Sequence, residues 1–161
     1  MREQKASLPD KPSDLITAAI IDLEKAEKMP DVYTINMGKW HEPVTYWYED
    51  DTLVQGKGDE RCAICFAGAV MAMELGCTPI ENCMPSEYDD ATKLKLMSLD
   101  AFRCGQFDLA LDYWDAPKEK QEDIIQAAYG LYYDMPPYRD DPQKFKDSMR
   151  EVAEKLRHIG L

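Results

Sequence analysis

Two thiols and an imidazole are the residues of this sequence best suited to chemistry. Cys62 and Cys65 are three positions apart, and His41 is one of only two histidines. Two thiols at this spacing on a helix share one face, which is the geometry of half a zinc site or of a redox pair. Cys62 near a helix N-terminus could also be a nucleophile paired with His41. These patterns predict a small thiol- or metal-dependent enzyme or module that uses Cys62, Cys65 and His41.

The surroundings of the two thiols favour a packing role instead. No side chain from Cys62 to Met73 is charged, and a buried free cysteine behaves as a small hydrophobic residue. Cys77 and Cys83 flank a proline-containing stretch that is not a second zinc knuckle. We therefore expect no metal, no cofactor and no catalytic residue.

The cysteine count predicts a reducing compartment. The chain has five cysteines, an odd number, and its opening residues are polar rather than typical of an export signal. A chain of 161 residues can bury a core without disulfides. We expect all five cysteines to be free thiols and the protein to be cytoplasmic.

The charge of the chain limits its partners. Lys and Arg number 19 against 31 Asp and Glu, so the net charge is -12. Residues 1–58, 59–104 and 105–161 each carry a net charge of -4, so the acidity belongs to the whole folded surface. Such a surface repels nucleic acid and anionic membranes. It predicts docking on a partner with a basic surface, or it serves solubility alone.

The candidate contact residues are acids in predicted loops or helix caps and the aromatic side chains beside them. Exposed acids steer association, and tyrosine and tryptophan anchor interfaces. The predicted partner-binding residues are Glu49, Asp50, Asp51, Asp89, Asp90, Trp47 and Tyr48.

The pattern of apolar residues predicts an α+β fold, mostly helical, in a single domain. Residues 60–75 lack charge through their middle and end at Gly76, which predicts a buried central helix. Strand-forming residues within 32–54 predict a small antiparallel sheet. Helical spacing of apolar residues predicts the other helices. We expect residues 1–12 to be a flexible arm and residues 13–161 to form the globular domain.

Three segments carry a family resemblance. Residues 40–41, 62–72 and 93–105 together resemble small uncharacterised proteins of bacteriophages and prophages, over about residues 32–112. The resemblance implies a phage accessory protein in the host cytoplasm and brings no activity with it. With no GxSxG, HExxH or GxxxxGK[ST] motif in the chain, we expect a non-catalytic acidic protein that binds and inhibits a host protein. That host protein would be a nuclease or a defence complex that handles nucleic acid. A scaffold protein without an inhibitory role is the remaining alternative.

Overall fold

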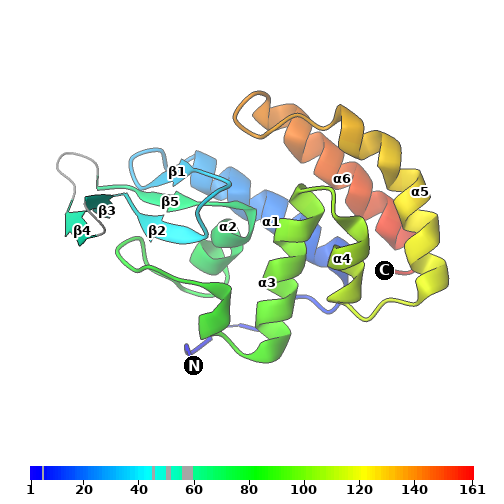
Figure 1. Ribbon diagram of the computed structural model, residues 1–161, viewed down its shortest axis with the longest axis horizontal. Helices are drawn as coiled ribbons and strands as arrows, with labels where there is room; N and C mark the ends of the chain where they lie inside the picture. Colours follow the sequence, from blue (N-terminus) through cyan, green and yellow to red (C-terminus); the bar gives the residue numbers. More distant parts are fainter. Residues whose placement is uncertain (5, 45, 50–51, 56–59) are drawn as a thin grey trace.

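The computed structural model describes residues 1–4, 6–44, 46–49, 52–55 and 60–161, which form one α+β unit with more helix than strand (Figure 1). The fold class predicted from the sequence is confirmed. In chain order the elements are α1 (Pro12–Glu27), β1 (Tyr33–Ile35), β2 (His41–Pro43), β3 (Tyr46–Glu49), β4 (Thr52–Gln55), β5 (Cys62–Ile64), α2 (Phe66–Met73), a 3-10 turn η1 (Pro85–Glu87), α3 (Asp90–Arg103), α4 (Phe107–Asp112), α5 (Lys118–Asp134) and α6 (Pro142–His158).

The central strand of the main sheet is β5, which pairs with β1 on one side and with β2 on the other. The β1–β5 pair is parallel and the β2–β5 pair is antiparallel. The sheet is therefore mixed, and the antiparallel sheet predicted from residues 32–54 is wrong in its pairing. The strands β3 and β4 form a separate antiparallel hairpin.

The sequence predicted one helix over residues 60–75, and this prediction is wrong. The structure divides them into the strand β5 and the helix α2, with Cys65 as the N-cap residue between them. The Cys65 sulfur accepts a hydrogen bond from the Gly68 amide at 3.3 Å, which starts the helix. A short apolar run fits a buried strand and a buried helix equally well, and only the pairing with β1 and β2 distinguishes them.

The helices α1 and α2 pack against this sheet, and the helices together bury a continuous core. The helix α1 packs against both α2 and α6, while α3 packs against α2 and α4. Phe66, Ile64 and Leu23 are among the side chains that are fully buried. Within the described residues, no helix is both long enough and apolar enough to cross a membrane.

Both ends of the chain lie against the domain. The backbone amide of Arg2 donates to Glu87, and Leu8 is buried in the core. At the other end, the amide and the hydroxyl of Ser13 both donate to the carbonyl of Leu161. The flexibility predicted for residues 1–12 concerns motion and stays a prediction, but the arm has specific contacts with the domain.

One buried carboxyl group lies between α1 and the end of α2. Asp22 is fully buried, and among the described residues no donor lies within hydrogen-bonding distance of its side-chain oxygens. Burial raises the pKa of Asp22 to about 8, with a further contribution from the neighbouring Glu74 carboxyl group, while the charge of Lys25 acts in the opposite direction. The folded protein therefore keeps Asp22 protonated at neutral pH.

The first prediction concerns Gly68, where α2 meets the chain before β2. A Cβ atom at this position would overlap the backbone carbonyl oxygen of Trp40, which cannot move without disturbing the sheet. We expect Gly68→Ala to lower the free energy of unfolding by about 1–3 kcal/mol, although alanine is the better helix former. Urea denaturation measures this change. The matched control is Gly38→Ala, whose Cβ would lie 3.3 Å from the Asn36 side chain, and an equal loss in both variants would contradict the prediction.

The second prediction concerns Asp22 and pH. Its pKa is about 8 when folded and about 3.9 in an unfolded chain, so the folded state holds a proton that the unfolded state releases. The stabilisation is complete below pH ~4 and is lost as the pH rises towards 8, by up to about 1.4 kcal/mol per pH unit. We expect Asp22→Asn to flatten this fall in urea denaturation at pH 5, 6.5 and 8. Parallel curves for the two proteins would show that Asp22 does not titrate in this range.

Candidate functional site

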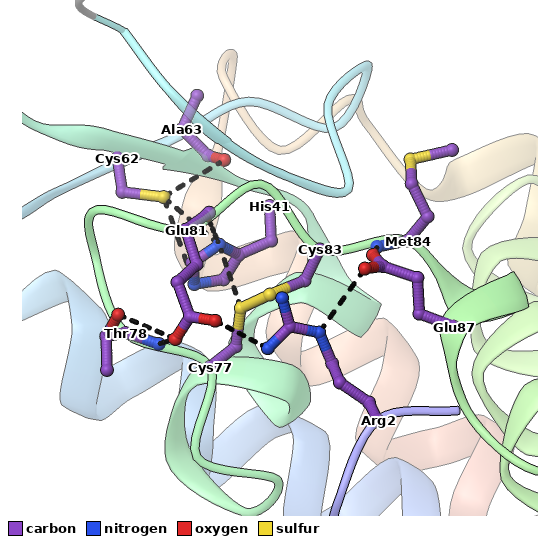
Figure 2. The surroundings of a disulfide bond; sticks show 10 residues. All are labelled: Arg2, His41, Cys62, Ala63, Cys77, Thr78, Glu81, Cys83, Met84 and Glu87. Atoms are coloured by element: carbon purple, nitrogen blue, oxygen red, sulfur yellow. Dashed lines mark hydrogen bonds and ion pairs between the residues drawn. A yellow bond between two sulfur atoms is a disulfide. The ribbon is translucent and has the colours of Figure 1, made fainter.

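Four side chains that can bind protons, electrons or a metal ion gather beside the main sheet (Figure 2). His41 belongs to β2 and Cys62 to β5, while Cys77 and Cys83 belong to the loop between α2 and η1. The β2–β5 register aligns Pro43 with Cys62, which makes His41 and Cys62 diagonal neighbours on one face of the sheet. All four side chains are buried.

The imidazole of His41 contacts sulfur atoms from two different segments. Its Nδ1 lies 3.4 Å from the Cys62 sulfur and 3.5 Å from the Cys77 sulfur, and its Nε2 lies 3.9 Å from the Cys62 sulfur. Cys77 and Cys83 are joined by a disulfide. The prediction that all five cysteines are free thiols is therefore wrong for this pair, because the loop folds back and brings its two ends together.

Backbone hydrogen bonds hold the two ends of the Cys77–Cys83 loop. The amide of Cys77 donates to the carbonyl of Met71 at 3.0 Å, in the last turns of α2. The amide of Cys83 donates to the carbonyl of His41 at 2.9 Å, which ties the loop directly to β2. The positions of both sulfur atoms thus follow from backbone contacts to α2 and β2.

Glu81 organises the middle of the same loop. Its carboxylate accepts hydrogen bonds from the amide and hydroxyl of Thr78, at 3.0 and 2.7 Å, and forms an ion pair with Arg2 at 2.6 Å (Figure 2). These contacts lower the pKa of Glu81 to about 2, with the Arg2 hydrogen bond as the largest cause. The N-terminal arm therefore fastens the loop through one charged contact.

The backbone of the loop determines which ring nitrogen of His41 carries the hydrogen. Nδ1 lies 2.9 Å from the carbonyl oxygen of Glu81, which can only accept, so Nδ1 carries the hydrogen and Nε2 the lone pair. Burial lowers the pKa of His41, so the ring is neutral. Burial also raises the pKa of Cys62 to about 12, which keeps its thiol protonated. The two groups form a neutral thiol–imidazole contact, and this arrangement does not supply the thiolate that a nucleophilic dyad needs.

The same atoms are suited to metal binding. One ligand atom each from His41, Cys77 and Cys83 lies within 4.8 Å of the other two. The sequence spacing set Cys77 and Cys83 aside as zinc ligands and did not connect them with His41. The pairing in the sheet and the fold of the loop, neither visible in the residue spacing, bring these residues together.

Cys62 and Cys65 do not act as a pair. Cys62 faces His41 from β5, whereas the Cys65 sulfur caps α2 and its pKa is raised to about 11 by burial. The predicted shared helix face does not exist, because a strand precedes the helix at Cys65.

The predicted partner-binding residues fall in two separate places. Trp47, Tyr48 and Glu49 belong to the strand β3, while Asp50 and Asp51 lie outside the described residues. Asp89 and Asp90 lie at the start of α3, far from the hairpin (Figure 1). The Asp89 carboxylate accepts from the Thr92 amide at 2.8 Å, which lowers the pKa of Asp89. Asp89 is therefore engaged as a helix cap, and Asp90 is the exposed acid of this pair.

A surface pocket of about 750 Å³ lies between the β1–β2 connection, the end of α3 and the α5–α6 loop. Met37, Pro137 and Tyr138 give it apolar walls, and Arg103 and Arg139 bring two cations to it. Arg103 pairs with Asp100 at 2.7 Å. The sequence pattern did not predict this pocket, which segments distant along the chain form together.

The fold and the buried cysteine–histidine cluster define a small α+β protein with a buried thiol–imidazole contact. No family model, curated protein or solved structure matches the chain. The resemblance to phage proteins stays a prediction.

The third prediction follows from the burial of the thiols. Cys62 and Cys65 are at most 2% exposed and hold their protons tightly, whereas Cys104 is only half-buried. We expect iodoacetamide to label Cys104 first in the folded protein and to label Cys62 and Cys65 only after unfolding. Peptide mass spectrometry after timed labelling measures the three rates. Labelling of Cys62 in the folded protein as fast as Cys104 would refute the buried thiol–imidazole contact.

Proposed function

We propose that this protein is a non-catalytic phage accessory protein of the host cytoplasm. It binds a host protein with a basic, nucleic-acid-handling surface and inhibits it by presenting carboxylates where nucleic acid would bind. The observation that carries the proposal is the net charge of -12, shared equally by the three parts of the chain. Basic nucleic-acid-binding surfaces attract such a protein at long range.

The internal ion pairs support an acidic outer surface. Arg150 contacts both Glu24 and Asp147, so one cation is shared by two acids. Arg157 likewise contacts Asp14 and Glu154. Since many cations are already paired within the chain, the excess charge that a partner meets is carboxylate.

The chemistry of the cysteine–histidine cluster supports a non-catalytic role. His41 is neutral and the Cys62 thiol is protonated, and both are buried. A thiol enzyme needs an accessible thiolate at neutral pH. The alternative that uses Cys62, Cys65 and His41 as one site loses Cys65, which caps α2. A scaffold protein without inhibition remains the other alternative and would share the acidic surface.

The partner is found by affinity capture from bacterial lysate and identified by mass spectrometry. The purified pair is then tested against a short DNA duplex and a short RNA. Mimicry requires that the nucleic acid and this protein compete for the partner, and that the complex weakens as salt rises. A scaffold protein would bind the partner without displacing nucleic acid.

The fourth prediction concerns the acids expected at the contact. We expect the double variant Asp50→Lys/Asp51→Lys to slow association with the isolated partner by about tenfold at low salt and to change dissociation less, since exposed charge acts mainly by steering. Surface plasmon resonance measures both rates. The matched control is Glu122→Lys/Asp123→Lys, which makes the same change of charge at exposed positions of α5.

Equal slowing by the test and control variants would mean that only net charge matters, which contradicts these contact residues. An unchanged association rate, with no salt dependence in the parent protein, would contradict electrostatic mimicry altogether.

A further inference from the structure

We propose that His41, Cys62, Cys77 and Cys83 form a zinc site when the Cys77–Cys83 disulfide is reduced. The proposal does not depend on the proposed partner. It starts from a single fact of the fold: two strands and one loop bring three sulfur atoms and one imidazole together (Figure 2).

The spacing of the ligand atoms fits one tetrahedral ion. Zinc binds sulfur at ~2.3 Å and imidazole nitrogen at ~2.0 Å, so a nitrogen and a sulfur on the same tetrahedral ion lie about 3.5 Å apart. Nε2 of His41, the nitrogen that would bind the ion, lies 3.9 Å from the Cys62 sulfur. Ligand atoms of His41, Cys77 and Cys83 all lie within 4.8 Å of one another, so small side-chain shifts would bring the four ligands around one ion.

The ligand set and its burial point to a structural zinc site. Three cysteines and one histidine are a common complete set for such a site, with no position left for substrate. Sulfur-rich tetrahedral sites select zinc over magnesium and calcium, which prefer oxygen. His41, Cys62 and Cys83 are fully buried and Cys77 is 3% exposed, so water has little access to the centre.

The histidine is already oriented for ligation. Its Nδ1 donates to the Glu81 carbonyl, which leaves the lone pair on Nε2. A ligating histidine usually donates its other ring hydrogen in this way, which fixes the ring and its tautomer. Glu81 is itself held by Arg2 and Thr78, so the supporting contacts exist without the ion.

The disulfide by itself leaves half of the cluster unexplained. It closes only the loop from Cys77 to Cys83 and does not link that loop to either strand. The Cys62 thiol would then have only a weak S–H contact with His41, and the Nε2 lone pair of His41 would lack a strong donor among the side chains of the cluster. A zinc ion would use all four side chains and would connect β2, β5 and the loop.

The two states are related by a balanced exchange. A cellular dithiol reduces the Cys77–Cys83 bond: the dithiol becomes a disulfide, and each of the two cysteines gains one proton. Zinc then forms bonds to three sulfurs and to Nε2 of His41, and the three thiol protons pass to solvent. Oxidation of the cysteines and zinc binding therefore exclude one another.

The experiment measures zinc in the whole protein. The protein is reduced with a phosphine, which becomes a phosphine oxide with oxygen from water, and is then given zinc and passed through a desalting column. We expect elemental mass spectrometry to find one zinc ion per chain. Cobalt in place of zinc should give the visible bands of a tetrahedral site and the ultraviolet band of thiolate ligation. The protein oxidised at Cys77–Cys83 should hold no zinc.

Substitutions separate ligands from neighbours. We expect Cys83→Ser and His41→Ala to lose bound zinc, while His41→Cys retains it through four thiolates. The matched control is Cys65→Ser, which removes a thiol that is just as buried but faces Trp40 and the start of α2. It should keep one zinc per chain.

The fifth prediction adds a readout that does not need the variants to fold. A strong chelator should lower the melting temperature of the reduced, zinc-loaded parent protein by several degrees and leave that of the oxidised protein unchanged. A folded, reduced parent protein that binds neither zinc nor cobalt would overturn the proposal. Iron bound in place of zinc would overturn the choice of metal, and equal zinc loss in Cys65→Ser would overturn the assignment of the ligands.

Discussion

The strand β5 is bonded on both of its edges, and the rest of the structure depends on that double pairing. It joins β1, which is parallel to it, to β2, which is antiparallel. Its last residue leads through Cys65 into α2, so the sheet fixes where this buried helix begins. Gly68 lets that helix approach the carbonyl of Trp40 more closely than any side chain would permit. The same pairing places Cys62 beside His41.

The cysteine–histidine cluster shows how weak individual contacts make a specific centre. The Glu81 carbonyl orients His41, and the Glu81 carboxylate forms an ion pair with Arg2 of the N-terminal arm. The Cys83 amide is bonded to the backbone of His41 itself. Each contact alone is modest, but together they hold ligand atoms from distant segments at separations that suit one ion.

The outer surface and the buried centre have different roles in our proposals. The centre is buried and uncharged in its protonated form, so it can stabilise the fold without contacting a partner. The surface carries the acidic excess that a basic partner would meet. The pocket beside Arg103 and Tyr138 lies on a third part of the molecule, between the β1–β2 connection and the α5–α6 loop.

The sequence alone predicted the α+β class and the presence of further helices, because the helical spacing of apolar residues is a local property. It also determined the acidity, which needs no structure. It could not distinguish the strand β5 from the helix α2, since a run of uncharged, apolar residues fits a buried strand and a buried helix equally well. Nor could it show that Cys62 lies beside His41 and the Cys77–Cys83 loop rather than forming a site with Cys65. That choice depends on contacts between segments distant along the chain, which only the tertiary structure brings together.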